Sequence, residues 1–163
     1  AVSWPHVVVL RSMTKFYALP GLRVGYAVSA QTTIRRIQRQ LPPWSVGTMG
    51  QVAALAALND EAHARTSLTF MTQESERFRR KLAALPGCAV MPTYANYCLV
   101  ELHRAHPARD ITERLRRKGV LIRDCSSVTG ANSRSVRLAV RTRSENDRLL
   151  RELSHLLLPK DSQ

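Results

Sequence analysis

Cysteine, aromatic residues and acidic residues are all scarce in this chain of 163 residues. The three cysteines, Cys88, Cys98 and Cys125, form no C-x-x-C pair, which argues against a disulfide scaffold and favours buried, inert thiols without a metal. No apolar run approaches the ~20 residues of a membrane helix, and the beginning of the chain lacks a secretory signal pattern. We therefore expect a cytoplasmic protein with no membrane partner.

The shortage of acidic residues leaves a formal net charge of +13, with 25 lysines and arginines against 12 acids. Such a balance invites a nucleic-acid interpretation. However, only 6% of the residues are aromatic, and no basic run is interleaved with them as in base-stacking platforms. The basic residues are spread over three expected helices, which favours solvated helix faces and no nucleic-acid partner. A basic, non-catalytic binding or dimerisation module is the alternative.

The first part of the chain predicts a small piece of sheet. Residues 6–11 (HVVVLR) and 23–29 (RVGYAVS) are continuous apolar stretches, which predict two buried strands in a sheet covered on both faces. Residues 31–40 predict a helix that ends before a pair of prolines. Because two strands cannot form such a sheet alone, we expect residues 1–48 to be the remnant of a larger domain.

The rest of the chain predicts a connecting helix and a small domain. Residues 49–85 are Ala-rich and then amphipathic, which predicts one long helix. Residues 86–159 alternate strands and helices in the order β-β-α-β-β-α, which predicts a compact α+β domain, followed by a tail at 160–163. The expected strands are residues 88–91, 97–102, 120–124 and 135–141.

The two helices of the small domain carry boundary signals. Asp110 is expected to cap the first helix, with Glu113 completing a pattern like the capping box. Gly119 is expected to end that helix in the left-handed conformation. Ser144 is expected to cap the last helix, which runs to about residue 158.

A single lysine stands in the segment LRSMTKFYALPGLRVGY, residues 10–26. Lys15 follows an apolar strand, so we expect it to be partly desolvated, and Arg23 lies eight residues further on. Burial and a nearby cation both lower the pKa of a lysine, which leaves an amine able to form a Schiff base. Ser12, Thr14 and Arg23 would supply a phosphate cradle. This combination is typical of pyridoxal-phosphate chemistry, although the spacing alone also allows a surface lysine.

The segment resembles the cofactor-lysine segment of the fold-type I pyridoxal-phosphate enzymes. Within that family the sequence of this segment is similar to that of the threonine-phosphate decarboxylases, with the histidinol-phosphate aminotransferases as close relatives. The resemblance implies an α/β fold, namely the C-terminal part of a fold-type I pyridoxal-phosphate-dependent transferase. It extends over PPWSVGTMGQVAALAAL (42–58), ANYCLVEL (95–102), LIRDCSSVTG (121–130) and VRLAVRTRSENDRLL (136–150).

The resemblance also implies roles for individual residues around the cofactor, pyridoxal 5'-phosphate. Lys15 would be the catalytic residue that attaches the cofactor, and Ser12, Thr14 and Arg23 would bind its phosphate. Tyr17 would either line the site or have a structural role, with equal weight on both interpretations.

Three further positions are implied to contact the substrate. Arg137 matches the family arginine that binds the substrate α-carboxylate, and Arg123 matches a second arginine for a substrate anion. Asn96 would line the site or be structural, and Arg141, on the same strand as Arg137, is expected to be structural. Two guanidinium forks suit a small phosphorylated amino acid.

The implied activity is decarboxylation of L-threonine O-3-phosphate to (R)-1-amino-2-propanol phosphate for cobalamin biosynthesis, and transamination is the alternative. Gly47 stands where the family usually has asparagine, which puts the substrate in doubt. The resemblance implies a chain about twice this length that works as a homodimer, in which the other half pairs with the pyridine nitrogen. We therefore expect the 163-residue chain alone to be inactive, whether it is a fragment or a short gene product.

Overall fold

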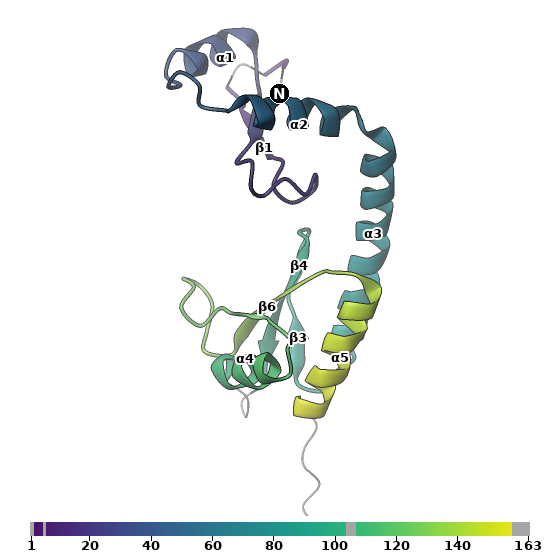
Figure 1. The fold of residues 1–163 in the computed structure, drawn as a ribbon. Coiled ribbons are helices and arrows are strands. Elements are labelled where there is room, and N and C mark those ends of the chain that lie inside the picture. The colour runs from purple at the N-terminus through teal and green to yellow at the C-terminus, as the bar shows by residue number, and fades with distance from the viewer. Residues whose placement is uncertain (1, 5, 104–106, 158–163) are drawn as a thin grey trace, which may run out of the picture. The chain divides into compact units, whose positions relative to one another are not determined.

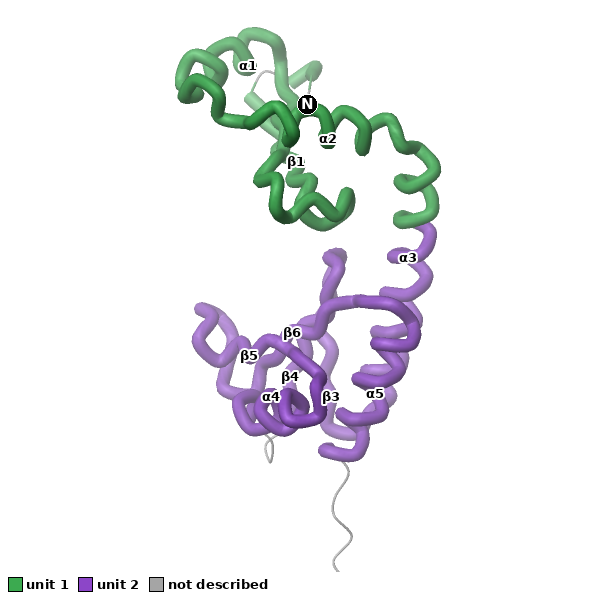
Figure 2. The backbone as a smooth tube through the Cα atoms, in the orientation of Figure 1, with its two compact units in different colours: residues 1–68 green, residues 69–163 purple. Residues whose placement is uncertain are grey.

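The chain folds into two compact units, residues 1–68 and residues 69–163 (Figure 2). The computed structural model describes residues 2–4, 6–103 and 107–157. Figure 1 shows the helices and strands in chain order, and the boundary between the units lies inside the long helix α3 (Glu61–Ala83). The expected tail at 160–163 and the expected helix end at residue 158 lie outside the described residues.

A two-stranded antiparallel sheet begins the first unit. Strand β1 (Val9–Ser12) pairs with strand β2 (Gly25–Val28), so that Ser12 lies opposite Gly25. The prediction that these strands are buried is wrong for this structure, because β1 is exposed throughout and β2 is at most half-buried. The Val9 and Leu10 side chains of β1 are both exposed to solvent.

Helices complete the first unit, and one of them was expected to be longer. Helix α1 (Gln31–Gln38) is followed by helix α2 (Thr48–Asn59), and the predicted single helix over residues 49–85 is broken at Asp60. The Asp60 Oδ1 accepts a hydrogen bond from the His63 backbone N–H at 2.9 Å, which caps the first turn of α3. The Asp60 carboxylate therefore caps a new helix, α3, at a position where the apolar pattern alone predicted one continuous helix.

The second unit contains a four-stranded antiparallel sheet, whose strands lie in the order β3 (Cys88–Val90), β4 (Tyr97–Leu102), β6 (Ser135–Ala139) and β5 (Arg123–Asp124). The expected strand at 97–102 is confirmed as β4 (Tyr97–Leu102), whose side chains alternate between buried and half-buried. Strand β5 is only Arg123–Asp124, because Val120 is still tied to the end of the preceding helix through its N–H to the Leu115 carbonyl (2.9 Å).

One face of this sheet packs against helices. The core combines side chains from α3, α4 (Ala108–Arg117) and α5 (Arg143–Leu157) with the inward residues of β4 and β6. Phe78, Leu138 and Leu153 are fully buried in it. The outward residues of the same strands alternate with these core residues. The unit is therefore the α+β arrangement that the sequence predicted, with helices packed on the inward face of the sheet.

The start of α4 differs from its prediction. Asp110 lies in the first turn instead of capping the helix, because the Pro107 carbonyl accepts the backbone N–H of Asp110 at 3.1 Å. Glu113 does not complete a capping box either, since its carboxylate accepts hydrogen bonds from Arg116 and Arg117. The expected left-handed conformation of Gly119 is confirmed by a φ of 72°.

The last helix is capped by Thr142, not by Ser144. The Thr142 N–H donates to Glu145 Oε2 at 3.2 Å, and the Thr142 hydroxyl donates to the same oxygen at 2.6 Å. Glu145 N–H lies 3.5 Å from the Thr142 hydroxyl oxygen, so the T-x-x-E sequence forms the reciprocal contacts of a capping box. Ser144 lies inside α5, one residue after its start.

Acidic solution is expected to weaken this end of the second unit. Hydrogen bonds from Arg141 and Thr142 lower the pKa of Glu145 to about 2. Between about pH 4.5 and that value the unfolded chain binds more protons than the folded one, so stability falls as the pH falls. Urea unfolding across this window should show a smaller pH dependence for Glu145→Gln than for the unmodified protein. Equal pH dependence of the two proteins would contradict the role of Glu145.

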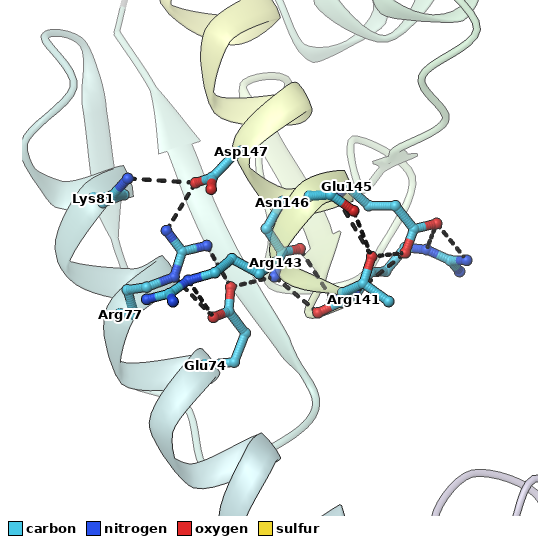
Figure 3. A network of polar contacts seen from close by, with 10 residues as sticks. Glu74, Arg77, Lys81, Arg141, Arg143, Glu145, Asn146 and Asp147 are labelled. Carbon is cyan, nitrogen blue, oxygen red and sulfur yellow. Dashed lines mark hydrogen bonds and ion pairs between the residues drawn. The ribbon is translucent and has the colours of Figure 1, made fainter.

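A buried polar network joins α3 to α5 (Figure 3). The side chain of Glu74 is only 6% exposed, and it accepts hydrogen bonds from Arg77 Nε and from Asn146 Nδ2, both at 2.8 Å. Arg77 also donates to Asp147 at 2.8 Å. Asn146 exchanges two hydrogen bonds with the backbone of Arg141, just beyond β6. The Arg77 guanidinium keeps the pKa of Glu74 below its usual value.

Candidate functional site

The hairpin brings the expected cofactor residues to one end of the first unit. Beyond the last paired residues of β1 and β2, Met13 N–H donates to the Val24 carbonyl at 3.2 Å, which continues the ladder toward Arg23. Leu19 N–H donates to the Met13 carbonyl at 3.3 Å and closes the intervening turn. Met13 is buried and anchors this turn. The backbone therefore holds Ser12 and Arg23 at the two sides of the turn that carries Lys15.

Gly25 allows the two strands to approach closely. An added Cβ at Gly25 would lie 2.8 Å from the Arg11 carbonyl oxygen, a distance that side-chain carbons do not tolerate against backbone. The glycine in the sequence R-V-G-Y thus has a packing reason beside the candidate phosphate residues.

The polar side chains of residues 12–23 carry hydroxyl groups or positive charges and no carboxylate. The Thr14 backbone N–H donates to the Ser12 Oγ at 3.3 Å, and Arg23 Nη1 donates to the Pro20 carbonyl at 3.2 Å. Lys15 is exposed, so the expectation that it is partly desolvated is wrong for this structure. Within the described residues no carboxylate pairs with Lys15 or Arg23. A set of donors without an acidic partner fits a phosphate group such as that of pyridoxal 5'-phosphate.

The turn also holds its backbone in an uncommon conformation. Ala18 and Arg23 have φ angles of 52° and 49°, in the left-handed region that residues other than glycine seldom adopt. Such residues persist where the surrounding contacts determine the conformation. The contacts of the turn with its neighbours therefore matter for the position of Lys15.

An aromatic cluster, which the sequence did not suggest, lies beside Lys15. His63 in α3 contacts both residues that follow the lysine, since its ring stacks on Tyr17 and meets Phe16 edge to face. The His63 Nε2 lies 3.0 Å from the Phe16 carbonyl oxygen. Tyr17, left open between a site and a structural role, packs in this cluster. A histidine that is 47 residues from its partner in the chain leaves no signal in local spacing.

The second unit brings the two candidate substrate arginines together. Arg123 on β5 lies directly opposite Arg137 on β6, and cross-strand partners project from the same face of a sheet. Both side chains are exposed. The Arg137 guanidinium lies 5.2 Å from the centre of the Tyr97 ring, a cation–π distance. Tyr97 is thus a neighbour of the arginine pair that the sequence did not single out.

Asn96 lies directly before β4, the neighbour of β6, and Arg141 lies just beyond β6. Asn96 directly precedes β4, and its backbone carbonyl accepts the Val140 N–H at 3.0 Å while its side chain is exposed. Arg141 forms an ion pair with Glu145 at 2.8 Å. This pairing agrees with the structural role that was expected for Arg141.

Gly47 occupies an open position. It precedes α2 with an extended φ of −65°, and an added Cβ would meet nothing within 4 Å. Any residue can adopt this backbone conformation, so an asparagine would fit here without strain. The departure from the family pattern therefore changes which side-chain groups are present and not the backbone.

Other chemistry finds little support in the described part of the chain. Cys88, Cys98 and Cys125 are free thiols, and burial raises the pKa of Cys88 to about 11, so that this thiol stays protonated. Among the described residues there is no group of three or more histidine, cysteine or acidic side chains placed to bind a metal. No helix within them is long and apolar enough to cross a membrane.

Comparisons of the sequence with known proteins agree on one family. The family described as aminotransferase class I and II matches residues 3–153. The threonine-phosphate decarboxylase of Salmonella typhimurium is 40% identical over 154 residues, which cover 94% of this chain and 42% of that protein. A histidinol-phosphate aminotransferase of Methanococcus maripaludis is 32% identical over 157 residues, which cover 96% of this chain and 42% of that protein. The chain thus spans less than half the length of the curated relatives it matches.

Solved structures give the same picture. The histidinol-phosphate aminotransferase of Clostridium acetobutylicum matches with a TM-score of 0.87 at 26% identity, covering 94% of this chain and 46% of that one. The L-threonine-O-3-phosphate decarboxylase of Porphyromonas gingivalis matches with a TM-score of 0.83 at 25% identity, and the match covers 94% of this chain and 47% of that one. The histidinol-phosphate aminotransferase of Sinorhizobium meliloti was solved with pyridoxal 5'-phosphate. It matches with a TM-score of 0.78 at 27% identity, and the match covers 94% of this chain and 41% of that one. These matches confirm the expected α/β fold class over part of the relatives' length.

Proposed function

Because the chain belongs to the aminotransferase class I and II family, we propose that it supplies the cofactor lysine and the substrate arginines of an enzyme that acts on a small phosphorylated amino acid. The enzymes of this family depend on pyridoxal 5'-phosphate, and one solved relative contains it. The observation that carries the proposal is the turn after β1, where Lys15 stands between Ser12 and Arg23 without an acidic partner among the described residues. That arrangement suits a phosphate beside an amine.

The chain's own residues would divide the work of cofactor binding. Lys15 would hold the cofactor through its ε-amine, while the Ser12 and Thr14 hydroxyls and the Arg23 guanidinium would donate to its phosphate. When bound, the pyridoxal ring delocalises the electron pair that is left at the substrate Cα after a bond there breaks. The free Lys15 amine would then be the group that moves a proton at Cα.

In the second unit, the arginine pair would bind the substrate anions. Arg137 is proposed to bind the α-carboxylate as a bidentate fork, and Arg123, opposite it, a second anionic group. The Tyr97 ring restricts the Arg137 guanidinium on one side. The orientation of the carboxylate decides whether the bond to CO₂ or the bond to hydrogen is aligned for cleavage, so these side chains influence the type of reaction.

Decarboxylation of L-threonine O-3-phosphate is the proposed reaction. It is supported by the 40% identity to a threonine-phosphate decarboxylase, against 32% for a histidinol-phosphate aminotransferase. Transamination is the second candidate, supported by the higher TM-score of a histidinol-phosphate aminotransferase, 0.87 against 0.83 for a decarboxylase. The arginines and the lysine would serve both reactions.

A product analysis separates the two reactions. With pyridoxal 5'-phosphate and L-threonine O-3-phosphate, we expect release of CO₂ and formation of a phosphorylated amino alcohol, with no consumption of an added 2-oxo acid. With histidinol phosphate and a 2-oxo acid, we expect no amino-group transfer above the background. The assay uses the longer gene product wherever one is encoded, and the 163-residue chain, which we expect to be inactive alone, is assayed beside it. Amino-group transfer without CO₂ release would contradict the proposed decarboxylation and support transamination.

The helical arginines give little support to the rival, nucleic-acid-binding function. Arg79 pairs with Glu76 on α3, and Arg116 pairs with Glu113 on α4 at 2.8 Å. Such pairs within one helix neutralise part of the basic face. They favour the interpretation of these residues as solvated helix surfaces.

A further inference from the structure

We propose that His63 is a positioning residue for Lys15: it holds the turn that carries the lysine through a hydrogen bond to the Phe16 carbonyl and through ring contacts with Phe16 and Tyr17. The inference builds on the proposed cofactor role of Lys15. His63, the turn and the β1–β2 hairpin all belong to the first unit.

The hydrogen bond fixes the peptide immediately after the lysine. His63 Nε2 lies 3.0 Å from the Phe16 carbonyl oxygen, and a carbonyl oxygen only accepts hydrogen bonds. This contact therefore places the imidazole proton on Nε2. The Ser67 hydroxyl oxygen lies 3.3 Å from the same nitrogen, and with the proton on Nε2 it can only accept from the ring. Both partners thus select one orientation of the imidazole.

Ring packing restrains the same two residues. The His63 and Tyr17 rings are stacked, with centroids 6.3 Å apart and an interplanar angle of 28°. Phe16 meets His63 edge to face at 6.1 Å, and Phe16 meets Tyr17 in the same way at 4.9 Å. Aromatic pairs in these geometries are favourable. The rings of Phe16, Tyr17 and His63 thus contact one another in pairs, and these contacts restrain the two residues that follow Lys15.

His63 is itself held on a defined support. It lies in the first turn of α3, where its backbone N–H is bonded to the capping carboxylate of Asp60 at 2.9 Å. Ser67 lies one turn further along the same helix. The helix cap therefore holds the backbone of His63 in place, and the His63 side chain holds the turn that carries Lys15.

The turn requires such external support. Ala18 lies two residues after Phe16 with a φ of 52°, and its N–H closes a bond of 3.2 Å to the Lys15 carbonyl. Backbone strain at Ala18 favours other conformations of the turn. Loss of the His63 contacts would let these conformations compete, so Lys15 would spend less time beside Ser12 and Arg23.

Four variants of the 163-residue chain test the inference. His63→Leu removes the donor and the ring, His63→Phe keeps only a ring, and His63→Gln keeps only a side-chain N–H. His6→Leu is the matched control, because His6 is exposed in the same unit. Circular dichroism first establishes that each variant is folded.

The first measurement is amide hydrogen exchange of Ala18 and Leu19, whose N–H groups close the turn. We expect His63→Leu to raise their exchange rates about threefold to tenfold, as for the loss of one ordinary hydrogen bond. His6→Leu should leave the rates unchanged. Unchanged rates in folded His63→Leu would overturn the inference. If His63→Leu does not fold, the other two variants decide, and normal protection in both of them would overturn it.

The second measurement is selective labelling with pyridoxal 5'-phosphate and borohydride, followed by peptide mapping. The label on Lys15 is divided by the label on Lys81, which pairs with Asp147 in the second unit. This ratio should fall in His63→Leu because the phosphate donors and the amine are less often in position together. A general loss of stability would not change the ratio in a folded sample, and an unchanged ratio would overturn the link to Lys15. If faster exchange is seen but the unmodified chain shows no preference for Lys15, the proposed cofactor role fails while the contact between His63 and the turn stands.

Discussion

Lys15→Ala, introduced into a gene product of the relatives' full length, is expected to abolish covalent attachment of pyridoxal 5'-phosphate and to lower turnover by roughly three or more powers of ten. The lysine is the only amine in the turn that carries the candidate phosphate donors, and the reaction would lose both its attachment point and its proton carrier. Two measurements check this expectation: the visible absorbance of the protein with added cofactor, and product formation from L-threonine O-3-phosphate.

Lys81→Ala provides the control for this substitution. Lys81 pairs with Asp147 at 3.3 Å on the surface of the second unit, so its loss removes the same charge at a site with a structural partner. We expect normal cofactor absorbance and normal turnover in Lys81→Ala. A Lys15→Ala protein that retained the absorbance band and the activity would refute the assignment of the cofactor lysine.

Glu74→Ala is expected to cost about 3–5 kcal/mol in free energy of unfolding, the largest effect on stability that we predict. Glu74 is 6% exposed, and its removal leaves the side chain of Arg77, 12% exposed, with Asp147 as its remaining partner. It also removes an acceptor from the buried Asn146 amide. Denaturant unfolding at neutral pH measures the loss.

Glu113→Ala separates the effect of burial from the effect of ion pairing. Glu113 also accepts hydrogen bonds from arginines on its own helix, but its side chain is 39% exposed and solvent can replace them. We expect a far smaller change in the free energy of unfolding for this variant. If both substitutions cost the same, the network between α3 and α5 would not have the stabilising role that its burial suggests.

Local patterns predicted the order of the strands and helices in the second unit, but not all of their ends. The strand at residues 97–102 matches β4, because alternating burial on a one-sided sheet follows the two-residue period of the side chains. The conformation of Gly119 also followed from its position after a helix. By contrast, the prediction that Ser144 caps α5 was wrong, because the helix starts directly after Thr142 and the T-x-x-E sequence forms the cap.

Burial in the first unit could not be predicted from apolar composition. The run HVVVLR was expected inside a covered sheet, yet β1 is exposed because burial depends on what packs against a strand and not on its own residues. For the same reason Lys15 is exposed, although its flanking residues suggested desolvation. The helix break at Asp60 shows a related limit, since one capping hydrogen bond outweighs the continuity of an apolar pattern.

The sequence by itself determined the family, and it identified Ser12, Lys15 and Arg23 as the candidate cofactor residues, because residue type and spacing can be read from the chain. It also determined the β-α order of the second unit, which depends on short-range periodicity. Only the tertiary structure decided which distant side chains meet: His63 with the turn of Lys15, and Glu74 with Asn146. These contacts join residues 47 and 72 positions apart, and no local pattern encodes a separation that only packing determines.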